Sequence, residues 1–304
     1  MQRFLPLMQR EWLQHRFGWT LLALLPLALA LLLTGFGQVQ IDGDDMEHAG
    51  AALPTLLAMA AIAGCTAVVA LIAWFSSLII VSALARRDHA DRSIEFWLSL
   101  PVSHSQSVAA PLLVHLILVP AAALVIGLLG GYALSFLLVG RVVGWQVWFG
   151  LPWVDIVAGT GAFMLRLMAG LPLATLWLSP LILLVVLMTA WFRRWGWALL
   201  AVGFGLGGYI LKRLFGQPWL NEVTTDLLRH AARAFLSARD SGVQVSGPEQ
   251  ALDALHAMPA WLLTDLGYAL RELASPLMLG SLLFSALCFA LLIQWRQRGA
   301  GGAA

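Results

Sequence analysis

Charged residues are scarce in this chain, and their scarcity excludes an ordinary soluble domain. Of its 304 residues, 11% are Asp, Glu, Lys or Arg, whereas 60% are hydrophobic. A soluble domain carries about 25% charged residues, so this chain cannot cover itself with polar surface. The net charge of +2 also gives no basis for a nucleic-acid partner.

Lysine and cysteine are rarer still, which excludes a phosphate-binding loop and a cysteine metal site. Lys212 is the only lysine, and it lies in the segment YILKRL rather than in a glycine-rich phosphate loop. Cys65 and Cys288 both lie inside apolar runs, where packing is the expected role, and they form no disulfide framework or metal-ligand spacing. The motifs H-E-x-x-H and G-x-S-x-G are absent as well, so nothing in the sequence argues for catalysis.

The most prominent feature of the sequence is a set of long apolar runs. About 20 apolar residues are needed for a helix to cross the hydrocarbon core of a bilayer. Because alternating strand-like patterning is missing, helices are the expected spanning elements. We therefore expect an all-α integral membrane protein with six transmembrane helices. The six runs are Phe17–Phe36, Leu53–Ala85, Ser107–Val139, Leu167–Phe192, Trp195–Leu211 and Pro276–Trp295.

The positions of the arginines predict the orientation of these helices. Cytoplasmic loops of membrane proteins carry an excess of Lys and Arg. With the N-terminus inside, ten arginines fall in the pieces expected to be cytoplasmic, whereas the first outer loop, Gly37–Ala52, has four acids and no basic residue. The second outer loop, Gly140–Arg166, has two arginines, and Lys212 and Arg213 lie against the rule at the outer end of the fifth run. We predict that both termini are cytoplasmic.

Two segments outside the apolar runs have helical patterns of their own. In residues 1–16, Leu5 and Trp12 share one face and Arg10 lies on the other, which is typical of a helix lying in the membrane surface. Residues 214–275 form a small helical extracytoplasmic segment, too short for an independent enzyme domain. Its helices are expected over Leu220–Phe235 and Ala251–Leu273.

Few ionisable groups fall inside or beside the apolar runs. His115, in LLVHLIL, is the one clear intramembrane case, and such groups are functional candidates by default. A neutral, hydrogen-bonded packing histidine is the favoured interpretation. Asp155 and Arg166 lie near the expected outer boundary. The stretch Asp42–His48 lacks the spacing of a calcium loop, so a solvated acidic turn is preferred there.

A charged and aromatic island, residues 86–106, separates the second and third apolar runs. Each of these runs is 33 residues long. At 1.5 Å per residue, a surplus of about 13 residues adds roughly 20 Å beyond the bilayer. We therefore predict a helical hairpin that projects into the cytoplasm, with the island at its tip.

The island itself has the pattern of a short capped helix followed by a second cap. Asp91 or Ser93 can cap a helix that ends at Pro101, and Ser103 with Gln106 makes an S-x-x-Q capping box for the next helix. A short helix with an aromatic anchor and a charged rim suits a groove on a soluble partner. The alternative is a tip that rests at the lipid headgroups, and the length surplus argues against it. The candidate partner-binding residues are Asp91, Arg92, Ser93, Ile94, Glu95, Phe96, Trp97, Leu98 and Leu100.

The segment DRSIEFWLSLPVSHSQSVAAPLL, Asp91–Leu113, resembles the cytoplasmic loop of ABC exporter permeases of the type-2 superfamily. In that family an acidic-basic pair precedes an aromatic-bearing short helix, and Leu-Pro-Val with a polar cap then opens the third transmembrane helix. The six-helix plan, the surface helix and the cytoplasmic termini extend the similarity over most of the chain. Residues 214–275 depart from a minimal permease.

The resemblance implies that Ser93–Leu100 is a coupling helix that docks in a cleft of a separate ATPase subunit, with Glu95 and Trp97 as the preferred contacts. The implied partners are two copies of that ATPase, a second permease copy or a paralogous permease, and membrane lipid, in a bacterial inner membrane. ATP and Mg would be bound by the ATPase, so this chain is not expected to be an enzyme by itself or to hold a cofactor. The alternative is a non-transporting membrane assembly or sensor protein whose extracytoplasmic segment binds a partner.

Overall fold

The chain is helical throughout the part that its computed structural model describes, which comprises residues 4–37, 50–90, 103–237 and 248–301. No strand occurs in these ranges. The elements are α1 (Phe4–Phe36), η1 (Gly50–Ala52), α3 (Leu53–Ala90), α5 (His104–Leu113), η2 (Val114–Leu118), α6 (Val119–Val139), η3 (Gly140–Gly144), α7 (Trp145–Phe149), α8 (Trp153–Phe192), η4 (Arg193–Trp195), α9 (Gly196–Phe215), α10 (Trp219–Phe235), α11 (Pro248–Glu272) and α12 (Pro276–Gly301).

Six helices are long and apolar enough to cross a membrane, and each contains one of the six predicted runs almost entirely. The all-α membrane fold is therefore confirmed.

The predicted second outer loop is wrong in one respect, because most of Gly140–Arg166 is helical. α7 packs back on α6 through rings of Phe136 and Trp148, and α8 begins at Trp153, 14 residues before the run predicted from hydropathy. The Gly and Thr residues at 159–161 dilute the apolar signal there, and the segment packs against α6 and α11.

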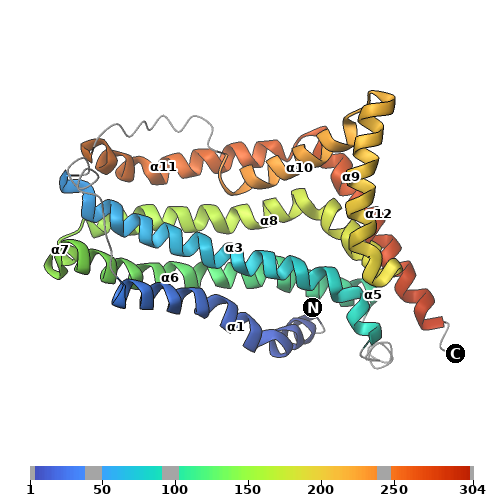
Figure 1. Ribbon diagram of the computed structural model, residues 1–304, viewed down its shortest axis with the longest axis horizontal. Helices are drawn as coiled ribbons and strands as arrows, with labels where there is room; N and C mark the ends of the chain where they lie inside the picture. The colour runs from blue at the N-terminus through green and yellow to red at the C-terminus, as the bar shows by residue number, and fades with distance from the viewer. Residues whose placement is uncertain (1–3, 38–49, 91–102, 238–247, 302–304) are drawn as a thin grey trace.

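α3, α6 and α8 run side by side along the length of the molecule, with α1 on one flank and α10 and α11 on the other (Figure 1). α3 and α6 pack most closely, and two glycines of α6 one turn apart make this possible. A Cβ at Gly127 would lie 2.8 Å from Cα of Thr66, and one at Gly131 would lie 2.6 Å from Cα of Ile62. Small residues at i and i+4 let helix backbones approach in this way in membrane proteins.

α8 is the central element, because it contacts α3, α6, α9, α10, α11 and α12. Its residue Trp177, 1% exposed, lies in the largest buried apolar cluster, where α8 meets α10, α11 and α12. α11 runs in the same direction as α8, whereas α10 runs in the opposite direction (Figure 1). Both helices expected in 214–275 therefore form, and they contact the bundle along the side of α8. The side of the membrane on which that segment lies stays a prediction.

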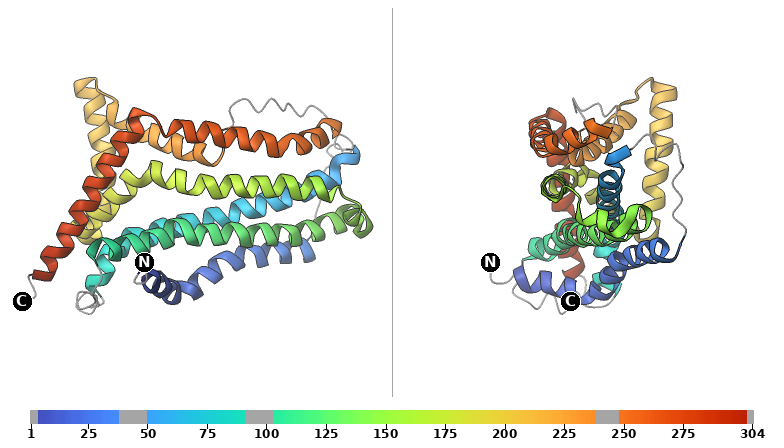
Figure 2. Two further views of the ribbon diagram at one scale, coloured as in Figure 1. Left: turned by 180° about the vertical axis from the view of Figure 1, so that it is seen from behind. Right: turned by 90° about the vertical axis from the view of Figure 1, so that its left-hand side faces the viewer.

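α9 differs in direction from the other apolar helices. It lies across the end of the bundle where α8 finishes, instead of running back along it (Figures 1 and 2). The turn passes through Arg193, whose φ of 53° is a left-handed value, and Gly196 then packs against the backbone of Thr189 without room for a side chain. Most of the surface of α9 is exposed, which suits a helix that faces lipid.

α1 is one helix of 33 residues, and its first turns bend away from the direction of the remainder (Figure 2). The expected surface helix is thus joined to the first span without a break. The face turned to the bundle carries Leu7, Glu11 and Trp19, all buried, while Leu5 and Trp12 are exposed. A buried glutamate on this face is the unexpected feature of the helix.

Candidate functional site at the loop end of the bundle

The predicted coupling residues, 91–100, lie outside the described part of the chain. The structure describes the two helices that flank them, which we call their frame: α3, which ends at Ala90, and α5, which begins at His104. Ser103 caps α5 in an extended conformation, and the backbone N–H of Gln106 donates to its Oγ at 3.3 Å. The first half of the predicted capping box is therefore confirmed.

This frame is longer than a bilayer requires. α3 has 38 residues, which at 1.5 Å each is about 57 Å against a hydrocarbon core of about 30 Å. The loop between α3 and α5 begins and ends at the end of the bundle that also holds the first turns of α1 and the last turns of α12 (Figure 1). α5 contacts α1, α3 and α12, so a displacement of the loop reaches three further helices directly.

A π-helical turn, η2, follows α5 and sets the direction of His115. The N–H of Val119 bonds to the carbonyl of Val114, five residues earlier instead of four. Pro120 explains the irregularity, because it has no N–H to give to the carbonyl four residues before it. Such π-bulges recur at functional sites. Here the bulge turns His115 inward, where its side chain has no exposed surface.

His115 meets Glu11 and His15 of α1 in a polar cluster inside an apolar surround. Nε2 of His115 lies 3.4 Å from Oε2 of Glu11, and Nδ1 of His15 lies 3.9 Å from the same oxygen. The indole of Trp19 stacks on His15 and meets His115 edge to face, with ring centroids 5.4 Å and 5.1 Å apart. This combination of two imidazoles and one carboxylate is a donor set that suits a divalent metal ion.

The expected hydrogen-bonded packing histidine is therefore not what the structure contains. His115 is buried, but neither of its ring nitrogens has a hydrogen-bond partner among the described residues. The cluster was missed from the sequence because Glu11 and His115 are more than a hundred residues apart. The sequence did contain one indication, because Leu7, Glu11, His15 and Trp19 are spaced four residues apart and therefore share one face of a helix.

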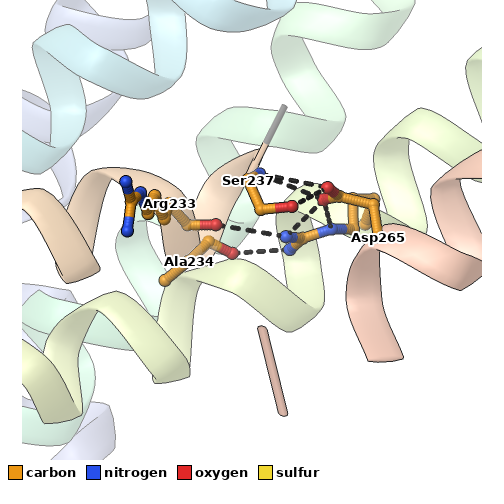
Figure 3. Close-up of polar contacts among 5 residues, drawn as sticks. Arg233, Ala234, Ser237 and Asp265 are labelled. Carbon is orange, nitrogen blue, oxygen red and sulfur yellow. Dashed lines mark hydrogen bonds and ion pairs between the residues drawn. The ribbon is translucent and has the colours of Figure 1, made fainter. Parts of the chain in front are cut away.

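A second buried polar site ties α8 to α10 and α11. Nε and Nη2 of Arg166 lie 2.9 Å and 2.8 Å from Oδ2 of Asp265. The same guanidinium donates to the carbonyls of Ala234, at 2.5 Å, and Arg233, at 3.3 Å (Figure 3). Ser237 completes the site, because its N–H and its hydroxyl both donate to the Asp265 carboxylate. We call these residues the Arg166 clasp.

Hydrogen bonding and charge decide the protonation of this clasp. Burial raises the pKa of Asp265, but the hydrogen bonds from Ser237 and from Arg166, together with the positive charge of Arg166, outweigh it and lower the pKa below its ordinary value of 3.8. The Asp265 carboxyl group is thus ionised at neutral pH. Arg166 was expected near the outer boundary; the structure shows that it is buried inside the protein, and its depth in the membrane stays a prediction.

The signal for this clasp was present in the sequence. Arg166 and Asp155 are the only charged residues of the 40-residue helix α8, and a buried charge needs a partner of opposite sign. Asp155 has a more exposed partner, because its Oδ1 lies 2.9 Å from Nδ1 of His256. The partner of Arg166 could not be chosen from the sequence, because the segment after α9 holds several acids.

Comparisons with protein-family models, with curated proteins and with solved structures find no match to this chain.

Proposed function

We propose that this chain is the membrane-spanning permease subunit of an ATP-binding-cassette exporter, coupled to a separate ATPase through the loop between α3 and α5. The observation that carries the proposal is the overlong helical hairpin with its aromatic island. α3 extends about 27 Å beyond what the hydrocarbon core needs, and residues 91–100 between α3 and α5 resemble a coupling helix.

The packing around α5 supports this role. In the proposed cycle, ATP binding closes the two ATPase subunits and moves the loop. α5 contacts α1, α3 and α12, so the movement passes to the first, second and last spans together. The chain itself hydrolyses no ATP in this scheme, because it has no phosphate-binding loop.

The alternative is a non-transporting assembly or sensor protein that binds a partner through 214–275. Apolar residues of α10 and α11, among them Leu227, Leu255 and Leu262, are buried against the bundle. The stripe on α10 is therefore used within the chain, which favours the permease over a protein whose free segment captures a partner.

Affinity purification of the full-length chain from its native membranes tests the proposal. We expect an ATPase to co-purify, and we expect Trp97→Ala to weaken its capture more than Glu95→Ala. A desolvated aromatic at a hot spot contributes about 2–4 kcal/mol, whereas a charge at the rim contributes less than about 1 kcal/mol.

Phe149→Ala is the matched control for Phe96→Ala. Phe149 is an exposed aromatic residue on α7, at the opposite end of the bundle, and its loss should leave capture unchanged. Undiminished capture by the Phe96→Ala, Trp97→Ala double variant, at equal membrane levels, would end the assignment of a coupling helix. Recovery of the wild-type chain without any ATPase would favour the alternative.

A further inference from the structure

We propose that Glu11, His15 and His115 form a binding site for a divalent zinc ion between α1 and η2. The inference rests on the polar cluster itself and does not depend on the proposed transport function.

The positions of the ligand atoms fit such an ion. Each of the three residues offers one ligand atom, and these atoms all lie within 4.8 Å of one another. Zinc binds imidazole nitrogen and carboxylate oxygen at about 2.0–2.2 Å in tetrahedral geometry, which places neighbouring ligand atoms about 3.3–3.6 Å apart. The separations of 3.4 Å and 3.9 Å at Oε2 of Glu11 require only small side-chain adjustments.

His115 gives an independent reason to expect a ligand. Its side chain has no exposed surface, and neither ring nitrogen has a hydrogen-bond partner among the described residues. Leaving a buried polar group without a hydrogen bond is costly. A metal ion bound at Nε2 would remove that cost for the nitrogen that faces Glu11.

The donor set also selects the class of metal. Two imidazoles and one carboxylate suit borderline first-row ions, whereas magnesium and calcium prefer all-oxygen sites. The side chain of His15 is 23% exposed, so the site has one side open to the surface. A three-residue site of this kind leaves the fourth zinc position for water or another small ligand.

Such an ion would strengthen a contact between two elements that already meet through Glu11 and His115. α1 contributes Glu11 and His15 from one turn, and the π-helical turn η2 contributes His115. Trp19 covers the two imidazoles from the next turn of α1. The metal would therefore fix the bent first half of α1 against the helix that leads from the cytoplasmic loop.

Zinc binding by the full-length chain in detergent, after removal of metal with a chelator, tests this site. We expect one tightly bound zinc per chain by elemental analysis, with the affinity measured in competition with a chromophoric chelator. His15→Ala should weaken binding by more than about tenfold, and Glu11→Gln should do the same. Cobalt substituted for zinc should give the visible spectrum of a tetrahedral nitrogen-oxygen site.

His256→Ala is the matched control, because His256 is an exposed histidine beside the carboxylate of Asp155, far from the cluster. Its affinity for zinc should equal that of the wild type. His15 is only partly buried, so His15→Ala decides the matter even if His115→Gln fails to fold. Wild-type affinity in His15→Ala, or no tight zinc in the wild type, would show that the cluster is an ion pair only.

Discussion

At the scale of single residues, the Arg166 clasp is the feature in which buried charges most require partners. Arg166 and Asp265 are 2% and 1% exposed, and their charges are compensated by each other, by Ser237 and by two backbone carbonyls. Removing one partner of such a pair leaves a buried charge and costs about 3–5 kcal/mol, although the intact pair contributes far less than that. A substitution of either residue alone is therefore expected to destabilise the fold more than a substitution of both by apolar residues.

Asp265→Asn should lower the thermal unfolding midpoint of the purified protein markedly, because it leaves the guanidinium of Arg166 buried without a negative charge. The expected loss of unfolding free energy is about 3–5 kcal/mol. Asp155→Asn is the matched control, since that carboxylate pairs with an exposed histidine and contributes less than about 1 kcal/mol. The double variant Arg166→Met, Asp265→Leu should recover part of the loss, and equal effects of the two Asn variants would contradict the role of the clasp.

The same pair predicts how stability depends on pH. The pKa of Asp265 is lowered in the folded state, so its contribution is complete above the ordinary value of 3.8 and is lost as the pH falls through the still lower folded value. The difference in unfolding midpoint between wild type and Asp265→Asn should thus be constant between about pH 5 and 8. It should shrink only below about pH 4. A difference that already disappears near pH 6 would contradict the pairing.

At the scale of elements, the contact between α3 and α6 depends on the absence of side chains. Gly127 and Gly131 face Thr66 and Ile62 so closely that any Cβ would meet the backbone of α3. Van der Waals packing of this kind replaces the hydrophobic effect as the force that joins helices in lipid. This contact holds together the antiparallel pair α3 and α6, which flanks the loop between α3 and α5.

Gly131→Ala should weaken the fold, because the added Cβ would lie 2.6 Å from Cα of Ile62 and would force α3 and α6 apart. We expect a loss of about 1–3 kcal/mol, typical of overpacking. Gly161→Ala is the control. It lies in α8 with no atom within 4 Å of the added carbon, so it should be neutral or should stabilise the helix by up to about 1 kcal/mol. Thermal unfolding in detergent distinguishes the two, and equal midpoints would count against close packing.

The elements also show how far sequence reasoning reaches. Apolar runs of the right length identify all six helices, because lipid leaves a chain few other ways to satisfy its backbone. The early start of α8 was missed because Gly159 and Gly161 lower the local hydropathy, and the segment packs against α6 and α11, which are distant in the sequence. The direction of α9 and the pairing of Arg166 with Asp265 arise from packing between distant segments, which no local pattern encodes. The coupling residues themselves stay a prediction.

At the scale of the whole molecule, the described helices place the loops at two opposite ends. α3 finishes and α5 begins at one end, together with the first turns of α1 and the last turns of α12 (Figure 1). The start of α11 lies at the other end, where it contacts η1 and the beginning of α8. The loops that follow α1 and α10 are thus expected on one side of the membrane, and the loop after α3 on the other.

Single cysteines placed at Asp44 and Ser241 should react with a membrane-impermeant maleimide from outside intact cells. Cysteines at Arg92 and Arg298 should react only after permeabilisation, because both termini and the loop after α3 are predicted to be cytoplasmic. The native Cys65 and Cys288 are buried and serve as an unreactive background. Labelling of position 241 from the inside alone would show that the 214–275 segment is cytoplasmic.

The Arg166 clasp also has a consequence for the synthesis of the protein, because its two charged residues are made at different times. Its two charged members are 99 residues apart, and ribosomes add about 5–20 residues per second. Arg166 is therefore synthesised about 5–20 s before Asp265. During that interval Arg166 lacks the carboxylate with which it pairs in the folded chain. The part of the chain synthesised last thus supplies the partner of a charge in a much earlier helix. A chain truncated before residue 265 would contain Arg166 without the aspartate that pairs with it.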